Sequence, residues 1–167
     1  MSVLNIRTLP DSVLREKAKK VTQFDESLQN LIEDMIDTMR YANGVGLAAN
    51  QVGVLLRVVV IEIPDEDEVR VLINPEIIKV DGERTVDEGC LSIPGYRGEL
   101  TRSIKVRVKA LDRIGKALRI RAEGLLAQAL EHEIDHINGI LYIDHLSSHE
   151  HLWKLDRDEV ETTTEVI

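Results

Sequence analysis

The chain has 167 residues, of which 43% are hydrophobic and 31% charged, and its 30 acidic and 21 basic residues give a formal net charge of −9. This composition is typical of one soluble globular domain and excludes disordered, collagen-like and membrane-spanning chains. With 3% aromatic residues and no Lys/Arg-rich block, direct binding of nucleic acid is not expected. The sequence shows neither a signal-peptide pattern nor an apolar run of the ~18 residues that span a membrane, so we expect a cytoplasmic protein.

The amino-terminal part predicts two helices. Asp11 is positioned to cap a short helix that continues to about Lys20. A longer helix is predicted over residues 25–41, because apolar side chains recur there at the spacing of one buried face, and Asn43 and Gly44 end it. These apolar positions are Leu28, Leu31, Ile32, Met35, Ile36 and Met39.

Strands are predicted in the middle of the chain, where β-branched residues are frequent. Residues 54–63 and 69–73 flank an acidic turn and are expected to form an antiparallel pair. Further strands are expected at 76–80, 84–87, 104–111 and 117–122, with hairpin turns at Asp81-Gly82 and at residues 112–115.

A second strong helix is predicted from near Gly124 to Ile137. The expected fold is α+β, with mostly antiparallel β-sheets packed around this central helix and a long amino-terminal helix. Residues 1–146 are expected to form a single domain. Residues 147–167 are expected to be an acidic tail or short helix, either part of that domain or frayed, and we expect its Thr run and final Glu-Val-Ile to fray.

The helix near residue 124 contains an HExxH motif, His132-Glu133-Ile134-Asp135-His136. Residues four apart share one face of a helix, so both imidazoles can reach one metal ion while Glu133 lies beside its water ligand. The alternative is a pair of surface histidines on a solvated helix face. Asp135 faces another side and is expected to be a structural hydrogen-bond acceptor.

The third metal ligand decides the class of site. The pattern of metzincins requires a final His where this chain has Tyr142, so that class is excluded. A zinc-peptidase arrangement would use Asp156, with Glu150 and Glu159 nearby. The remaining candidate is the single cysteine, Cys90, whose thiolate a divalent cation would stabilise, although a lone cysteine is more often a small buried apolar residue.

Three segments in this order and spacing resemble the signature motifs of the peptide deformylases. They are GVGLAANQ at residues 44–51, EGCLS at 88–92 and HEIDH at 132–136. The resemblance also includes stretches such as Ile73 to Pro75 and Gly124 to Ala127, and it extends over roughly residues 4–146.

The resemblance implies that Cys90, His132 and His136 hold one divalent metal. Fe²⁺ is the implied physiological ion, with Zn²⁺, Ni²⁺ or Co²⁺ as substitutes, because this ligand set does not choose among them. The implied reaction is hydrolysis of the N-formyl group from the initiator methionine of nascent polypeptides. In it Glu133 accepts and returns a proton, while the Gln51 side-chain amide and the Leu91 backbone N–H stabilise the charge on the formyl oxygen.

The glycines of the motifs indicate a peptide-binding groove. Gly44, Gly46 and Gly89 let backbones approach closely, so an extended peptide can pair with the edges at Val45 to Gly46 and at Gly89. Val45, Leu125, Ala129 and the ring of His132 are the candidates for the methionine side-chain pocket, against the alternative of plain core packing. Of Arg97 and Arg102, one is expected to pair with Glu88 and the other, assigned as Arg97, to meet the peptide, unless both are simply exposed.

The expected partners are N-formylmethionyl nascent peptides, and the protein is expected to be a monomer. Some family members dock on the ribosome through a basic carboxyl-terminal helix, but from Ser147 onward this chain has two basic and six acidic residues. Any ribosome contact must therefore use another surface. His145, His149 and His151 form a weak candidate for a second metal site. Two alternatives remain open, a zincin-like endopeptidase and a catalytically silent metal-binding relative, and Glu133 and Gln51 argue against the second.

Overall fold

The computed structural model describes residues 2–162 and 165–167, without the side chains of 161 and 162. One antiparallel sheet organises the described chain. Its strands β1 (Gly46–Ala48), β2 (Val58–Glu62), β3 (Val69–Cys90), β4 (Ile93–Leu111) and β5 (Ala117–Glu123) are neighbours in this order, and β6 (Leu152–Lys154) pairs with β4. The α-helices are α1 (Glu26–Tyr41), α2 (Gly124–Ile137) and α3 (Arg157–Thr162). The expected α+β class with mostly antiparallel strands is confirmed.

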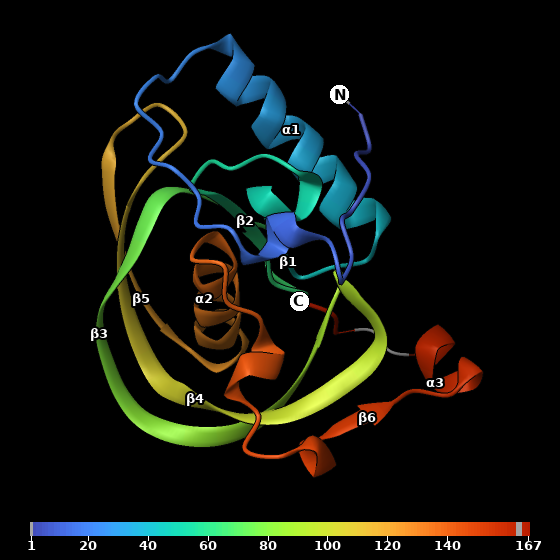
Figure 1. Cartoon of the computed structure of the whole chain (residues 1–167). Coiled ribbons are helices and arrows are strands. Elements are labelled where there is room, and N and C mark those ends of the chain that lie inside the picture. The colour runs from blue at the N-terminus through green and yellow to red at the C-terminus, as the bar shows by residue number, and fades with distance from the viewer. Residues whose placement is uncertain (1, 163–164) are drawn as a thin grey trace.

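The long strands β3 and β4 form a hairpin that curls around α2, with β5 continuing the sheet beside β4 (Figure 1). The hairpin turn predicted at Asp81-Gly82 is wrong, because β3 continues through these residues and Asp81 pairs with Lys105. The chain reverses instead between Cys90 and Ile93. Pairing with β4 along this whole length outweighs the local turn preference of Asp-Gly.

The helix predicted from Asp11 to Lys20 is much shorter than expected. Asp11 does cap it, since its side chain accepts a hydrogen bond from the Val13 N–H at 3.0 Å, but the helix is a single 3₁₀ turn over Ser12–Arg15. Beyond that turn the backbone pairs with distant segments. The N–H of Ala18 donates to the oxygen of Ile137, and Lys19 forms a parallel β-bridge with Leu56. These contacts require an extended chain, so the helix ends.

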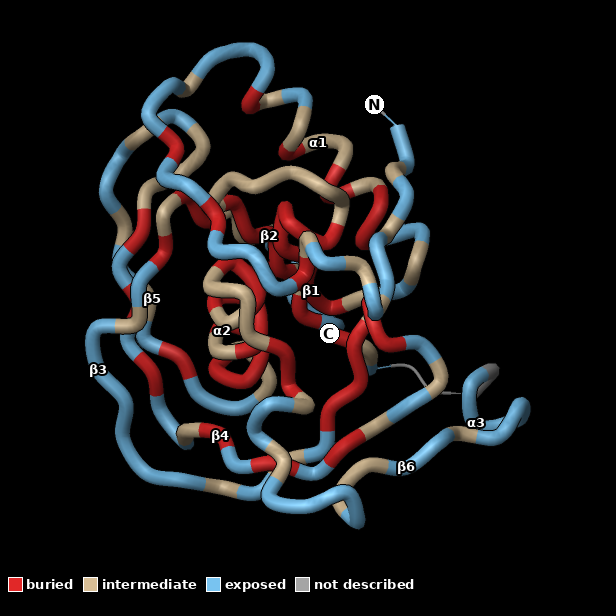
Figure 2. Tube along the Cα trace, in the orientation of Figure 1, coloured by how far each residue is buried: buried red, intermediate tan, exposed pale blue. Residues whose placement is uncertain are grey.

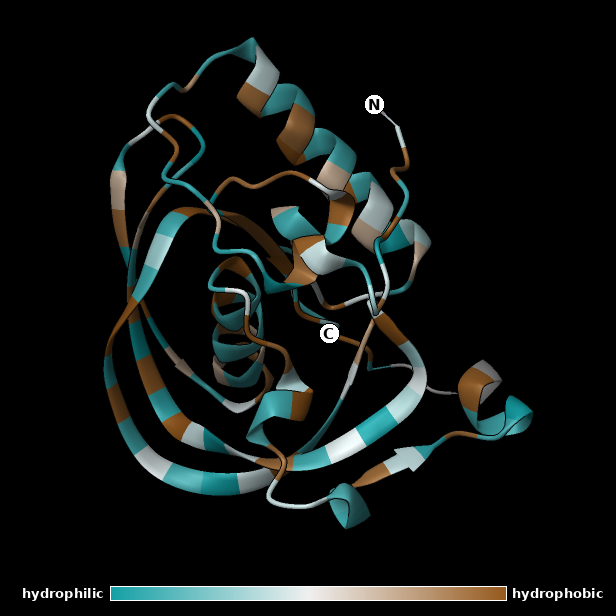
Figure 3. Ribbon diagram, viewed as in Figure 1, coloured by the Kyte–Doolittle hydropathy of each residue, from teal (hydrophilic) through white to brown (hydrophobic). Residues whose placement is uncertain are grey.

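Strand β2 is apolar on both faces because it separates two cores. Val58 and Val60 belong to the cluster that includes the apolar face of α1, whose first turn Asp25 caps. Val59 and Ile61 belong to the cluster built around α2. Figure 2 shows that α2 and the central strands are largely buried, whereas the outer curve of β3 is exposed. Along β3 and β4, hydrophilic and hydrophobic bands alternate (Figure 3), as one buried and one solvated face require.

The carboxyl-terminal segment does not follow the sequence expectation. Strand β6 and helix α3 lie beyond the hairpin (Figure 1), and the chain then returns so that Ile167 is only 2% exposed. Fraying was expected for Glu-Val-Ile and is wrong for Glu165–Ile167, whose backbone is hydrogen-bonded to the rest of the domain. Thr163 and Thr164 lie outside the described residues. Among the residues that are described, no helix has the length and apolarity to span a membrane.

Candidate active site

Helix α2 and the end of β3 bring three candidate metal ligands to one point. His132 and His136 lie one helical turn apart, and their Nε2 atoms are 3.1 Å from each other. Cys90, the last residue of β3, places its Sγ atom 3.3 Å from His136 Nε2. The thiol and the two imidazoles are buried, and their ligand atoms all lie within 4.8 Å of one another. This is the spacing of donors around a single ion.

The donor set fits a divalent transition metal. One thiolate and two imidazole nitrogens suit ferrous iron or zinc, and three protein ligands leave a position open for water. Beside them lies Glu133, whose two carboxylate oxygens are buried and have no hydrogen-bond partner among the described residues. An orphaned carboxylate next to three convergent ligands is an arrangement that a hydrated ion would satisfy.

Glu88 fixes the orientation of His132. Its carboxylate lies 2.7 Å from His132 Nδ1 and accepts two hydrogen bonds from Arg102, at 2.7 and 2.9 Å. Burial alone would raise the pKa of Glu88, but the bonds from Arg102 and His132 outweigh it and hold that pKa well below its usual range. Arg102 also donates to Asp135 at 2.8 Å, and Asp135 contacts His145 at 2.8 Å. Glu88 is therefore an ionised acceptor that directs Nε2 of His132 toward Cys90.

Gly46 makes room for Glu133. A Cβ atom at residue 46 would lie 2.6 Å from Oε2 of the Glu133 carboxylate, closer than real side chains approach. Burial raises the pKa of Glu133 to about 7, because desolvation disfavours the charged form. A group that titrates near neutral pH can both take up and release a proton there.

The 3₁₀ turn Ala49–Val52 supplies Asn50 and Gln51. The amide nitrogen of Gln51 lies 3.7 Å from Cys90 Sγ and donates to Ser92 Oγ at 3.0 Å, while its oxygen accepts from Ala48 N–H. The side chain of Asn50 donates to the backbone oxygen of His136. The GVGLAANQ segment therefore contacts both the cysteine and the histidine segments.

A cavity of about 270 Å³ adjoins Cys90. Gly89 and Arg97, two predicted peptide-binding residues, line it together with Leu91, whose N–H was assigned to the formyl oxygen. Gly44, Val45 and Gly46 form the neighbouring edge at β1. Val45 and Ala129 are buried in the α2 cluster, and Leu125 packs partly buried against it.

The two arginines have separate roles. Arg102 pairs with Glu88, whereas Arg97 lies at the cavity and pairs with the side chain of Asp87. Asn50, Ser92 and Tyr142 were not predicted as site residues. Asn50 lies in the GVGLAANQ segment and Ser92 in the EGCLS segment, so their positions within these motifs could have indicated a role at the site. Tyr142 stacks on the ring of His132, with ring centres 6.3 Å apart, and nothing in its local sequence indicates this.

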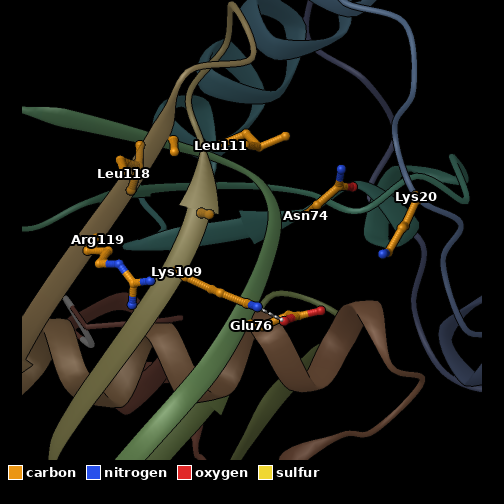
Figure 4. A pocket seen from close by; sticks show the side chains of 9 residues that line it. Lys20, Asn74, Glu76, Lys109, Leu111, Leu118 and Arg119 are labelled. Carbon is orange, nitrogen blue, oxygen red and sulfur yellow. Dashed lines mark ion pairs between the residues drawn. The ribbon is translucent and has the colours of Figure 1, made fainter.

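Other candidate sites lack suitable chemistry. Across residues 2–162 and 165–167, the only group of three ligand-bearing side chains that could hold an ion is Cys90, His132 and His136, so Asp156, Glu159 and the tail histidines form no second one. A larger cavity of about 520 Å³ is lined by β3, β4, β5 and Lys20 (Figure 4). It contains no histidine or cysteine, and its Glu76 is paired with Lys109 at 3.1 Å.

The comparisons with known proteins agree with this geometry. The family model for polypeptide deformylases matches residues 3–151. The chain belongs to this family. It is accordingly a metal-dependent hydrolase that removes the N-formyl group from nascent peptides, and the peptidase and silent-relative alternatives are not favoured.

Individual relatives are similar over nearly their whole length. A peptide deformylase of Dehalococcoides mccartyi is 59% identical over 159 residues, which are 95% of each chain. The crystal structure of a peptide deformylase from Legionella pneumophila has a TM-score of 0.85 at 56% identity and covers 87% of each chain. A deformylase from Synechococcus elongatus, solved in complex with actinonin, has a TM-score of 0.85 at 41% identity and covers 89% of this chain and 81% of that one.

Proposed function

We propose that Cys90, His132 and His136 bind one divalent metal ion, with Fe²⁺ as the physiological ion and Zn²⁺, Ni²⁺ or Co²⁺ as substitutes. The observation that carries this assignment is the convergence of the thiol and two imidazoles beside the unpartnered carboxylate of Glu133. Helix α2, surrounded by the sheet, is the scaffold of this centre, because it holds both histidines and Glu133 on buried positions.

When bound, such a metal supplies Lewis acidity and lowers the pKa of a coordinated water. Glu133 takes the proton of the attacking water, and the amide of Gln51 and the N–H of Leu91 donate to the formyl oxygen as it gains negative charge. The formyl C–N bond then breaks, the amine receives the proton that Glu133 held, and formate leaves. Burial of Glu133 supports this role because it brings the carboxyl pKa to about 7.

The substrate chain is proposed to lie in the groove between β1 and Gly89. Pairing through the N–H of Val45 and the oxygen of Gly89 uses only backbone groups and so tolerates any peptide sequence. Val45, Leu125, Ala129 and the ring of His132 are proposed to surround the methionine side chain, while Arg97 meets the peptide farther out.

We assign the catalytic domain to residues 1–146, with 147–167 as an acidic tail that belongs to the same domain. We propose a cytoplasmic monomer. Since the tail carries a net acidic charge, any contact with the ribosome would use a different surface.

Activity of the Fe²⁺-loaded protein tests these roles. Protein purified without oxygen and shown to contain one metal ion per chain is incubated with formyl-Met-Ala-Ser, and formate is measured. We expect formate from the wild type and a loss of at least about 100-fold in Glu133→Ala, as for removal of a general acid–base group. Metal content of the variant is the control. An active Glu133→Ala variant, or an inactive wild type with full metal content, would contradict the proposal.

A further inference from the structure

The segment Glu165–Ile167 lies in the groove beside the proposed metal ligands. Val45 N–H donates to the oxygen of Val166 at 2.7 Å, and Gly44 and Val166 form a parallel β-bridge. On the other side, Ile167 N–H donates to the oxygen of Gly89 at 3.3 Å. Figure 1 shows this end of the chain beside β1 in the middle of the molecule, although α3 lies at its periphery.

The segment uses the backbone groups that the proposed function gives to the substrate. The N–H of Leu91, assigned to the formyl oxygen, donates instead to the oxygen of Ile167 at 3.4 Å. Arg97, assigned to the peptide, donates to the oxygen of Glu165 at 2.9 Å. One strand edge cannot pair with two chains at once, so a peptide bound there must first displace Glu165–Ile167.

The side chain of Ile167 is also buried. It is 2% exposed and belongs to the same apolar cluster as Val45 and Ala129, two of the residues proposed to surround the methionine. Ile and Met are apolar side chains of similar size, and each gains by leaving water for this cluster.

We propose that Glu165–Ile167 is an intramolecular ligand of the substrate groove and competes with formylated peptides for it. The inference rests on the proposed position of the substrate. The segment advances into the groove toward its carboxyl end, whereas a formylated substrate enters amino end first. The segment therefore presents no N-formyl group and blocks the groove without being hydrolysed.

The competition has a quantitative form. If the groove is free for a fraction of the time, the apparent KM is raised by the inverse of that fraction, while kcat is unchanged once substrate is bound. The segment gains free energy from the burial of one side chain and from a few backbone hydrogen bonds. It loses conformational entropy because three residues become ordered, so it binds weakly enough for substrate to displace it. A groove free for about a tenth of the time would give a KM raised by about 10-fold.

The variant Ile167→Asp tests the competition, with Ile114→Asp as the matched control. The control makes the same substitution at a turn residue that is 74% exposed. For formyl-Met-Ala-Ser we expect Ile167→Asp to lower KM by about 10-fold with kcat unchanged. The control should match the wild type. A KM that is unchanged or higher in a folded Ile167→Asp would overturn the proposal. The milder Ile167→Ala, expected to lower KM less, replaces Ile167→Asp if that variant does not fold.

Two further measurements do not depend on turnover. Hydrogen exchange of the Val45 and Leu91 amides should be faster in Ile167→Asp than in the wild type, and Met-Ala-Ser should bind the variant more tightly and restore the protection. Unchanged exchange with unchanged affinity would refute an occupied groove. If the wild type produced no formate, the assigned catalytic roles would fail, and exchange and affinity would still decide whether the segment occupies the groove.

Discussion

A single carboxylate, Glu88, determines the orientation of His132, one of the proposed metal ligands. It is fully buried and touches both His132 Nδ1 and the guanidinium of Arg102. Asp135 also accepts from Arg102, but among the described residues it forms no hydrogen bond or ion pair with His132. Both acids therefore hold Arg102, but Glu88 is the one that also holds His132.

We expect Glu88→Gln to weaken metal binding by about 10- to 100-fold, the usual effect of removing the group that orients a ligating histidine. Titration of the metal-free protein with Zn²⁺ against a competing chelator measures this. Asp135→Asn is the matched control and should change the affinity by less than about 3-fold, because it leaves the His132 contact in place. Equal losses in the two variants would show that Arg102, and not the orientation of His132, is what matters.

The sequence indicated which residues are candidate metal ligands, but it indicated less well which side chains contact those ligands. The two histidines were predicted as ligands from the HExxH spacing, whereas Cys90 was assigned through the resemblance to the peptide deformylases. The ligand atoms of all three do converge. Arg97 and Arg102 both follow the cysteine motif, so residue type alone did not distinguish them as partners of Glu88. In the structure the buried one, Arg102, forms the pair. Tyr142 could not be predicted, since its contact with His132 depends on the path of the chain after α2.

At the scale of the elements, a row of like charges crosses the outer face of β3, β4 and β5. Lys79, Arg107 and Arg121 lie directly opposite one another there, so one row across three strands is entirely cationic. In the part of the chain that the structure describes, none of these three side chains pairs with an acidic residue. Like charges in directly opposed positions destabilise a sheet.

Replacing the outer member of this row should stabilise the sheet. We expect Arg121→Glu to raise the free energy of unfolding by about 0.5–1 kcal/mol at low salt, because it turns a repulsive cross-strand pair with Arg107 into an attractive one. Urea unfolding at low ionic strength and in 1 M NaCl measures this gain, which screening should largely abolish. Lys116→Glu changes the net charge equally in an exposed turn and should give no comparable gain. A gain that persists in 1 M NaCl would speak against the electrostatic cause.

Element prediction failed where partners are distant in sequence. Periodicity located residues 25–41 and 124–137, because a helix is specified by neighbours three and four residues away. The Asp81-Gly82 turn and the helix to Lys20 were wrong, since β4 and the contacts of Ala18 and Lys19 impose extended chain there. The position of Glu165–Ile167 had no local signal at all, because its partners lie near residues 45 and 90.

Across the whole molecule, Arg15 and Asp144 join the two ends of the catalytic domain. Arg15 Nη1 lies 2.5 Å from Asp144 Oδ2, although the residues are 129 positions apart, and the carboxylate also accepts the Leu141 N–H. Burial alone would raise the pKa of Asp144, but Arg15 and this N–H outweigh it and lower that pKa.

The pair should stabilise the fold in a pH-dependent way. Because the pKa of Asp144 is lower in the folded than in the unfolded chain, its contribution is complete above about pH 5 and is lost as the pH falls through the folded value. We expect Asp144→Asn to cost up to about 1 kcal/mol at pH 7, since the pair is partly exposed, and to match the wild type near pH 2. Urea unfolding over this pH range measures the difference. Arg15→Gln should behave alike, and a double variant whose loss is the sum of both would disprove the coupling.

The curled β3–β4 hairpin also sets the order in which the site is assembled. Gln51 and Cys90 are 39 residues apart, Cys90 and His136 are 46 apart, and only the closed sheet brings them together. Contacts of such long range form late in folding, because loop closure precedes any gain from them. During its own synthesis the chain therefore cannot assemble a complete set of ligands until α2 has emerged. A metal ion bound at the proposed centre would therefore report that β3, β4 and α2 have already come together.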